Sequence, residues 1–409
     1  MSEQTAKRSA AVPTDPPTPL VAKSARPPKS PKPRPVPKEA RPTPSLTVRP
    51  ISRELHEQWA ATRTCSFLQL PSWAEVKREW THESLGWFDG DTLVGAGLVL
   101  YRWIPKLKKA LAYLPEGPDV DWLSGRPVDD WLVPLIAHVR DGGAFSLKIG
   151  VTVVARTWDN STLKAAVGPG VRLRHVTPTH VNEHALGIRD WLLATGWQQR
   201  GAATGFGDVQ PRYVFQVDLR GQSEESLLAN MNQLWRRNVK KAEKAGVTVR
   251  IGTRDDLAAF HEVYVETARR DHFTPRPLSY FQRMWDALGD HLRLYIAHVP
   301  DSTRPGAAAI YVRVGAHAWY SYGASTTADR DARPSNAMQW RMLLDALAEG
   351  AHTYDLRGIS DTLDEEDPLF GLIRFKLGTG GEAVELLGEF DFAVQPMLAR
   401  VFDLYLKRK

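Results

Sequence analysis

One segment near the C-terminus combines a lysine with several glycines. The stretch LFGLIRFKLGTGGE, residues 369–382, places Lys376 at the end of an apolar run and follows it with three glycines in four residues. An amine in this setting is either a surface group whose stem covers apolar residues or a cation directed at a negative charge. The glycines would let the backbone approach a ligand closely. This segment alone leaves both interpretations of Lys376 open.

The same glycines raise the question of a phosphate-binding loop. The P-loop pattern GxxxxGK[ST] does not occur, and a lone GxG is a weak signal. The acetyl-CoA signature, Arg or Gln followed by xxGxG or xxGxA, is also missed, because three residues rather than two separate Arg374 from Gly378. A pyrophosphate needs consecutive backbone N–H groups at a helix N-terminus. The one-residue slip therefore argues against acetyl-CoA without excluding it.

A histidine pair is the next candidate for chemistry. HVNEH, starting at His180, matches the zinc-peptidase pattern HxxEH, which requires both imidazoles on one face of a helix and a third ligand further on. Because Gly187 follows closely, we expect surface histidines and no metal site. The nucleophile motif GxSxG does not occur. Cys65 has no cation near it in the sequence, and we interpret it as a small core residue.

The first 44 residues differ in composition from the rest of the chain. They consist largely of Pro, Lys, Arg, Ser and Thr, so they cannot bury enough apolar surface to fold, and we expect a disordered tail. The tail's net charge of +6 equals that of the whole chain. The rest is therefore neutral, and the high pI is no evidence for a nucleic-acid-binding core. The tail suits a solvated linker, or weak attachment to RNA or an anionic membrane.

Cysteine usage and hydropathy indicate a cytoplasmic protein. The single cysteine of the 409-residue chain allows no intrachain disulfide. The N-terminus lacks an apolar signal-peptide region, and no window approaches the ~20 apolar residues of a membrane span. We predict a cytoplasmic location, with peripheral contact at the membrane face left open.

Two segments follow one plan, in which Gly95 to Phe145 of the first and Gly306 to Tyr354 of the second each span about fifty residues. The first reads as a hairpin with its turn at Asp89-Gly90-Asp91, then a short strand, a helix and a strand, and the second repeats this order. The matching parts are residues 86–105, 110–117, 129–143 and 144–149 in the first segment, and 292–315, 316–325, 335–350 and 351–359 in the second. A duplicated α+β unit is the economical interpretation.

Predicted helices precede each unit. They cover residues 52–63 and 71–80 before the first unit, and residues 254–271 and 277–289 before the second. Helix pair, antiparallel strands, helix and strand is the order of the GNAT acyltransferase fold. We therefore predict an α+β fold of two tandem GNAT-like domains, an analogy that does not by itself establish chemistry.

Residues 223–246 are predicted to form one helix, capped by Ser223 with Ser226 and ended by Gly246. Its apolar positions at near-helical spacing are Leu227, Leu228, Met231, Leu234 and Val239. Its other side is basic, with Arg236, Arg237, Lys240, Lys241 and Lys244. Balancing acids are nearly absent, so a solvated face and a polyanion-binding surface both stay open.

Six segments in order resemble the Fem-type (FemXAB) peptidoglycan aminoacyltransferases, which build interpeptide bridges from aminoacyl-tRNA. They are FLQLPSWAEVK, AYLPEGPDVDW, NMNQLWRRNVKKAEKAGV, TARRDHFTPRPLSYF, WYSYGAS and FGLIRFKLGTGGE, and they span nearly everything after the tail. The resemblance implies two GNAT-like domains with a precursor channel between them, in the short form without a coiled-coil arm. We expect a tail over 1–44, a first domain over 45–215 joined by 388–409, and a second domain over 216–387.

The resemblance also implies a site for the diphosphate of a muramyl-pentapeptide precursor. In such relatives a lysine of the first domain and an arginine of the second bind the diphosphate, with tyrosines nearby. The matching positions are Lys77, Arg276, Tyr280 and Tyr322. Arg276 can hold phosphate oxygens bidentately. A turn-fixing role for Arg276, which lies between two prolines, is the alternative.

The resemblance places Phe375 and Lys376 at the reaction centre. Acyl transfer from a tRNA ester to an amine passes through a tetrahedral oxyanion, which a cation in a partly dry site stabilises. A general base for the amine is also expected, and some relatives carry an acid at the position that Gly150 occupies here. Either Asp119 or Asp121 serves as the base, or the substrate and the tRNA handle the proton themselves, so we leave the base unassigned.

We therefore predict an enzyme that moves an amino acid from aminoacyl-tRNA to the stem-peptide amine of a peptidoglycan precursor. Aminoacyl-tRNA is the co-substrate, and we expect no further cofactor. Arg236, Arg237, Lys240 and Lys241 are candidate contacts to tRNA phosphates. An acetyl-CoA-dependent N-acetyltransferase on the same fold is the alternative, and a precursor- or RNA-binding scaffold is a third hypothesis. The sequence does not determine the transferred amino acid, the number of residues added, the oligomeric state, or whether the precursor is uridine-linked or lipid-linked.

Overall fold

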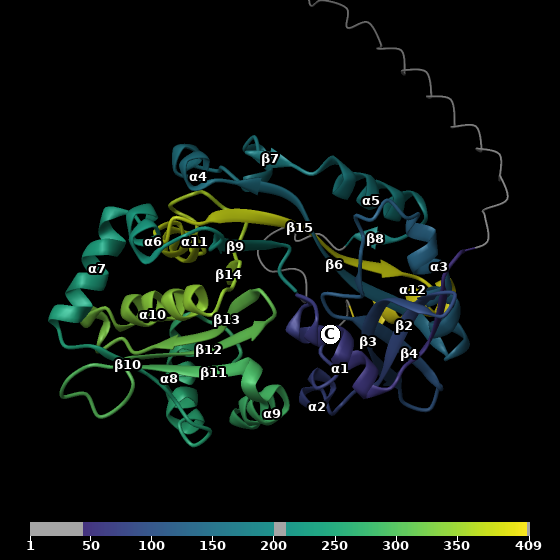
Figure 1. Ribbon diagram of the computed structural model, residues 1–409, viewed down its shortest axis with the longest axis horizontal. Coiled ribbons are helices and arrows are strands. Elements are labelled where there is room, and N and C mark those ends of the chain that lie inside the picture. Colours follow the sequence, from purple (N-terminus) through teal and green to yellow (C-terminus); the bar gives the residue numbers. More distant parts are fainter. Residues whose placement is uncertain (1–43, 200–209, 407–409) are drawn as a thin grey trace, which may run out of the picture. The chain divides into compact units, whose positions relative to one another are not determined.

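Strand pairing joins both predicted units into one sheet. The computed structural model describes residues 44–199 and 210–406, and within them fifteen strands belong to this sheet. The strands are β1 (Thr47–Pro50), β2 (Thr81–Asp89), β3 (Thr92–Ile104), β4 (Lys109–Leu114), β5 (Asp119–Val120), β6 (Ala144–Trp158), β7 (His180–Val181), β8 (Gln198–Gln199), β9 (Tyr213–Asp218), β10 (Thr248–Ile251), β11 (Leu292–His298), β12 (Ala307–Val314), β13 (His317–Ser325), β14 (Thr353–Gly358) and β15 (Glu382–Phe392). The main path runs β1-β2-β3-β4-β6-β15-β9-β14-β13-β12-β11-β10 (Figure 1).

Helices connect and cover these strands. They are α1 (Arg53–Ala61), α2 (Trp73–Val76), α3 (Val128–Asp141), α4 (Asn160–Ala166), α5 (Glu183–Ala194), α6 (Glu224–Asn230), α7 (Gln233–Lys244), α8 (Leu257–Arg270), α9 (Leu278–Leu288), α10 (Pro334–Ala348), α11 (Phe370–Leu377) and α12 (Pro396–Leu406). Helix α2 is shorter than the predicted helix over residues 71–80.

Two repeats of one topology lie along the sheet. In the first repeat (Thr81–Trp158), β2, β3 and β4 pair antiparallel, α3 follows, and β6 returns parallel to β4. In the second repeat (Leu292–Gly358), β11, β12 and β13 pair antiparallel, α10 follows, and β14 returns parallel to β13. The predicted α+β fold with two GNAT-like units is confirmed.

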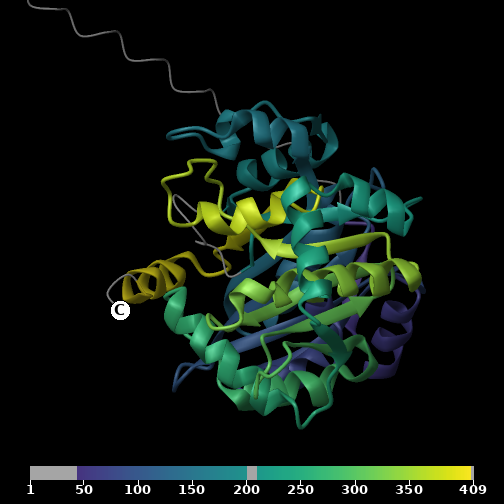
Figure 2. The same cartoon turned by 90° about the vertical axis from the view of Figure 1, so that its left-hand side faces the viewer.

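Strand β15 connects the two repeats through the backbone. It pairs antiparallel with β6 of the first repeat and with β9, which itself pairs with β14 of the second repeat. Helix α12 then packs on β6, where the Phe402 ring contacts Phe145 at 5.1 Å between centroids. Figure 2 shows this helix next to the C-terminus, at the left. The predicted domain limits stay a prediction, and the predicted tail falls outside the described residues except for Pro44.

A shared apolar core holds the segment before the first repeat against the second repeat. Phe67 packs edge-on against both Trp73 and Trp319, with ring centroids 5.4 and 5.3 Å apart. The same buried cluster includes Phe281 of α9 and Ile310 of β12. This packing brings the end of α2, and with it Lys77, to the second repeat.

Residues 223–246 form two helices, so our prediction of one helix is wrong. The predicted cap of Ser223 with Ser226 is present at the start of α6. The side chain of Asn232 then accepts a hydrogen bond from the Trp235 amide (2.8 Å) and begins α7 as a second N-cap. This break shifts the helical register. Trp235 is therefore buried, whereas Leu234, which we expected on the apolar face, is 61% exposed.

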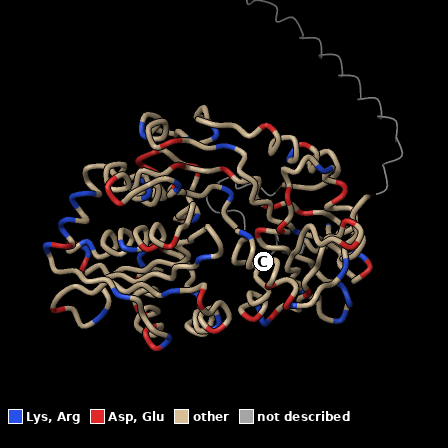
Figure 3. The backbone as a smooth tube through the Cα atoms, in the orientation of Figure 1, with Lys and Arg blue, Asp and Glu red and all other residues tan. Residues whose placement is uncertain are grey.

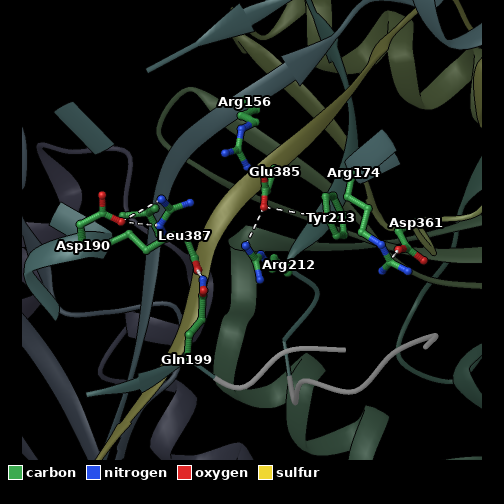
Figure 4. Close-up of polar contacts among 10 residues, drawn as sticks. Arg156, Arg174, Asp190, Gln199, Arg212, Tyr213, Asp361, Glu385 and Leu387 are labelled. Atoms are coloured by element: carbon green, nitrogen blue, oxygen red, sulfur yellow. Dashed lines mark hydrogen bonds and ion pairs between the residues drawn. The ribbon is translucent and has the colours of Figure 1, made fainter. Parts of the chain in front are cut away.

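A buried carboxylate ties three strands together near the middle of the sheet. Figure 4 shows Glu385 of β15 between Arg156 of β6 and Arg212, which directly precedes β9. Each Glu385 oxygen accepts from a different guanidinium, at 2.7 Å in both cases. A neighbouring carboxylate, Asp361, is paired with Arg174 in the same view. The Glu385 side chain is 2% exposed, so its charge depends on these two arginines.

Replacing Glu385 by alanine is expected to lower the free energy of unfolding by about 3–5 kcal/mol, because two partly buried guanidiniums lose their partner. Urea unfolding followed by circular dichroism measures the change. Asp218→Ala is the matched control, since it breaks the exposed Asp218–Arg220 pair and should cost at most about 1 kcal/mol. Equal losses in the two variants would contradict the role given to Glu385.

Candidate active site

Lys376 occupies the last turn of α11, and its surroundings explain the glycines that follow it. The helix ends at Gly378, and Thr379 Oγ1 donates to the Lys376 carbonyl at 2.7 Å. A Cβ on Gly378 would lie 1.8 Å from the indole of Trp235. Glycine is therefore required at position 378 by close packing against α7.

The amine of Lys376 is buried. Only 3% of the residue is exposed, which excludes the interpretation as a surface lysine. Its Nζ donates to the carbonyl oxygens of Gly358 (2.6 Å) and Arg357 (3.2 Å) at the end of β14. An ammonium has three N–H groups, so one donor remains for another acceptor.

Burial also sets the protonation of this amine. Removal from water lowers the pKa of Lys376 to about 7, the nearby Arg357 charge lowers it further, and Asp355 opposes the shift. Both protonation states are thus populated near neutral pH. The group can donate a hydrogen bond to a developing oxyanion, or exchange a proton, without a large energetic cost.

A polar network surrounds the two carbonyls that hold Lys376. Arg357 adopts a left-handed backbone conformation with φ +63°, and its amide donates to Asp355 Oδ1. Its guanidinium pairs with Glu116 Oε1 at 2.9 Å and donates to Gln210 Oε1 at 3.0 Å. Ser66 Oγ donates to the other Glu116 oxygen at 2.6 Å. The end of β14 is therefore linked to the loop after β4 in the first repeat.

Sequence reasoning missed Arg357, Glu116 and Asp355. Asp355 and Arg357 lie in the predicted strand segment YDLRGI, and Glu116 lies in YLPEG. A charged residue within or next to a predicted strand was the one signal that could have indicated a site. Charged groups at strand ends are common on surfaces, whereas all three side chains here are less than one-fifth exposed. Their burial arises from contacts between the repeats, which local patterns do not encode.

Gly150, at the position where the family resemblance led us to look for an acid, packs directly against the backbone of Glu116. A Cβ on Gly150 would lie 2.6 Å from the Glu116 amide nitrogen, so no side chain fits there. Asp119 accepts from the indole of Trp59 at 2.6 Å, and Asp121 accepts from a backbone amide within its own turn. Within the described residues neither aspartate bonds to the groups around Lys376. The general base stays unassigned.

Phe375 turns toward α7. Its ring lies 4.9 Å from the Trp235 ring, and the Trp235 indole N–H donates to the Phe375 carbonyl at 2.8 Å. Phe375 is half-buried. It fixes the last turn of α11, and through it Lys376, against α7.

The four predicted diphosphate residues come together from distant segments. Lys77, Arg276 and Arg283 all approach the Tyr280 ring, with their charged atoms 5.7, 5.4 and 5.9 Å from its centroid. The Tyr280 hydroxyl hydrogen-bonds to Tyr322 at 3.1 Å. Arg283 was not predicted, although it lies one helical turn after Tyr280.

This cationic cluster consists of Lys77, Arg276 and Arg283. Within the described part of the chain, none of the three forms an ion pair within 4 Å. Burial lowers the pKa of Lys77, the charges of Arg276 and Arg283 lower it further, and Glu79 opposes. Tyr322 also lies within electrostatic reach of Arg357, so the cluster borders the surroundings of Lys376. The arrangement suits a doubly charged anion.

Helix α7 carries a separate group of cations, and much of its backbone is blue in Figure 3. Arg237, Lys240 and Lys241 are exposed. Arg236 is engaged differently, because its guanidinium donates to the carbonyls of Ala229 (2.9 Å) and Met231 (2.6 Å) at the end of α6. The three exposed cations remain available to a ligand.

The histidine motif does not form a metal site in the described chain. His180 belongs to β7, Asn182 caps the following helix, and His184 belongs to α5, so the two imidazoles do not share a helix face. Among residues 44–199 and 210–406 no cluster of metal-ligating side chains occurs, and no helix has the length and apolar character needed to cross a membrane.

The chain matches the FemAB family over residues 51–305 and 300–407. It belongs to this family. Curated relatives include lipid II:glycine glycyltransferases of Staphylococcus saprophyticus, 23% identical over 401 residues, and of Staphylococcus aureus strain MRSA252, 24% identical over 412 residues. Both alignments cover 82% of this chain and 90% of the relative.

The crystal structure of FemX has the same fold. It aligns with a TM-score of 0.72 at 22% identity, covering 87% of this chain and 99% of that one. The predicted family is confirmed, and FemAB membership with relatives named glycyltransferases supports a transferase.

The lowered pKa of Lys376 predicts a pH-dependent effect of replacing it with methionine. Between the folded pKa of about 7 and the ordinary value of 10.5, the unfolded chain binds more protons than the folded one, so wild-type stability rises with pH. The Lys376→Met variant lacks this term. We expect its advantage in free energy of unfolding over wild type to be largest at or below about pH 6 and to shrink towards pH 10. Urea unfolding across this range measures it; a constant difference would contradict the shift.

Proposed function

We propose that this FemAB protein transfers an amino acid from aminoacyl-tRNA to the side-chain amine of the stem peptide in a peptidoglycan precursor. The observation that carries the proposal is the buried amine of Lys376, which has one N–H left over after bonding two backbone carbonyls. Family membership and the glycyltransferase names of the relatives support the same class of reaction. Aminoacyl-tRNA acts as co-substrate, and the proposal requires no other cofactor.

In this reaction the acceptor amine attacks the ester carbonyl of the donor. The carbonyl oxygen becomes an oxyanion, and the remaining N–H of protonated Lys376 stabilises it. Collapse of the intermediate forms the amide and breaks the ester C–O bond. The released ribose hydroxyl takes a proton, and the amine gives one up. With a pKa of about 7, Lys376 suits a step in which charge appears and disappears near it.

The cationic cluster is the proposed site of the precursor diphosphate. Lys77 and Arg276, the two predicted cations, lie on the Tyr280 ring without an acidic partner among the described residues. Arg283 joins them. Diphosphate oxygens would replace the missing counter-charge, and the hydroxyls of Tyr280 and Tyr322 could donate to them. The turn-fixing alternative for Arg276 leaves the other two cations of the cluster unexplained.

The exposed cations of α7 are the proposed contacts to tRNA phosphates. The helix packs on α11 through Trp235 and Phe375, so this basic face lies on the element that supports Lys376. The proposed phosphate contacts are Arg237, Lys240 and Lys241, because the Arg236 guanidinium is already hydrogen-bonded to carbonyls at the end of α6. The acetyl-CoA alternative would instead require a pyrophosphate signature that the sequence lacks.

Lys376→Met is expected to reduce transfer about 10²- to 10³-fold in kcat while leaving the KM for the acceptor nearly unchanged, because the lost interaction forms in the transition state. The assay offers labelled glycyl-, alanyl- and seryl-tRNA to uridine-linked and lipid-linked pentapeptide precursors. Lys164→Met, on the surface of α4, is the control. Unchanged turnover in Lys376→Met would remove Lys376 from the reaction, and acetylation with acetyl-CoA would replace the proposal by its alternative.

Replacing Arg237, Lys240 and Lys241 by glutamine is expected to flatten the salt dependence of tRNA binding. The slope of log K against log salt concentration should fall in magnitude by about one for each lost phosphate contact. Filter binding at several salt concentrations measures it. Lys106→Gln with Lys108→Gln, far along the sequence, is the control. An unchanged slope in the α7 variant would exclude this face from the tRNA site.

A further inference from the structure

The tip of the β3–β4 hairpin is an exposed surface with no role in the proposed reaction. It comprises residues 102–109, RWIPKLKK, and it ends the long strand β3. Lys106 and Lys108 both adopt left-handed backbone conformations, with φ of 70° and 44°, and so close the turn tightly. The tip therefore presents a short, fixed segment rather than an extended loop.

Two large apolar side chains at this tip are exposed to solvent. Trp103 is 43% exposed and Leu107 is 54% exposed. Trp103 is held in place, because its indole N–H donates to Thr81 Oγ1 at 2.7 Å and its ring stacks on Tyr101 with centroids 6.2 Å apart. Single exposed apolar residues need no explanation, but an oriented tryptophan and a leucine on one turn form a small apolar patch.

Cations flank these two apolar residues in the sequence. Arg102, Lys106, Lys108 and Lys109 give the eight residues a charge of +4, with no Asp or Glu among them. Among the described residues none of these four side chains forms an ion pair within 4 Å. An exposed tryptophan and leucine on a turn with three lysines match the interface of an anionic bilayer, where aromatic rings lie at headgroup level and the negative surface attracts each basic residue.

The base of the tip lines a cavity of about 490 Å³. Arg102 and Trp103 line it together with Arg78, Glu79, Trp80 and Thr81. Arg78 directly follows Lys77 of the cationic cluster in the chain. The cavity therefore begins one residue after Lys77 in the chain and reaches the hairpin at Trp103.

We propose that the β3–β4 hairpin tip docks on an anionic phospholipid surface and thereby presents a membrane-borne acceptor to the cationic cluster. Trp103 and Leu107 enter the headgroup region, and the lysines contact lipid phosphates. This rests on the proposed function and selects the lipid-linked precursor within it. RNA is the less suitable partner, because a leucine at the apex would bury little apolar surface against a ribose-phosphate strand. At the hydrocarbon boundary of a bilayer the same side chain would be buried.

Vesicle binding of the full chain tests the docking independently of catalysis. Co-sedimentation uses phosphatidylcholine vesicles with and without phosphatidylglycerol. Lys106→Glu with Lys108→Glu should weaken binding to the anionic vesicles by at least about tenfold. Trp103→Ser with Leu107→Ser should also weaken it. The matched controls are Lys240→Glu with Lys241→Glu, which makes the same charge change on α7, and Leu234→Ser, which removes another exposed leucine.

Equal weakening by the α7 controls, or full binding by the hairpin variants, would overturn the proposal. So would a hairpin variant that loses tRNA binding but keeps vesicle binding. Circular dichroism confirms that each variant is folded, and Lys106→Gln with Lys108→Gln provides a milder form of the charge change.

Transfer assays separate this inference from the proposed function. Lys106→Glu with Lys108→Glu should lower transfer to a lipid-linked acceptor in anionic vesicles, yet leave transfer to a uridine-linked acceptor in solution unchanged. Equal loss with both acceptors would contradict docking. If no acceptor supports transfer by the wild type, the proposed function fails while the vesicle measurement still decides the docking.

Discussion

The amine of Lys376 is held away from water by two backbone carbonyls, and much of the surrounding polar structure follows from the cost of placing it there. An ammonium in the interior loses its hydration, which several kcal/mol of new interactions must offset. The carbonyls of Arg357 and Gly358 supply part of this, and the charge of Asp355 supplies more. Because the balance is incomplete, the pKa falls to about 7, and the group becomes chemically useful near neutral pH.

That arrangement requires both repeats of the sheet. Arg357 contributes the carbonyl to Lys376, and its guanidinium is in turn held by Glu116 from the first repeat. Glu385 fixes β15 between β6 and β9 in the same region. A change in how the repeats pack would therefore move the carbonyls that hold the amine. Contacts between the two repeats therefore position the carbonyls that hold the buried Lys376 amine.

The other cations of the chain divide by their surroundings. Lys77, Arg276 and Arg283 share one tyrosine ring in a partly enclosed place and suit a compact, doubly charged ligand. The cations of α7 and of the β3–β4 hairpin tip are exposed and suit extended anionic partners. An apolar patch accompanies the hairpin tip, whereas α7 buries its tryptophan against Phe375. This difference in exposed apolar surface favours a membrane for the hairpin and a polyanion for α7.

Local patterns in the sequence determined the elements and their order. Alternating and helical periodicities, the Asp89-Gly90-Asp91 turn and the cap of Ser223 identified both repeats, and the ordered motifs identified the family. These features depend on neighbours within a few residues, so they can be read along the chain. Lys77, Arg276, Tyr280 and Tyr322 were named through the resemblance to the Fem-type family, and their role stays a proposal.

The tertiary structure decided which charges are buried and what they face. From the sequence alone, Lys376 could equally have been a surface residue. Its burial results from the packing of α11 on α7 and β14. The Asn232 cap divides the predicted helix, and the shifted register lets Trp235 pack against Phe375, a contact that depends on the fold. Glu116 and Arg357 lie in different repeats, and nothing local in either segment requires the other. Desolvation and ion pairing act through space, so their outcome is fixed only when distant segments meet.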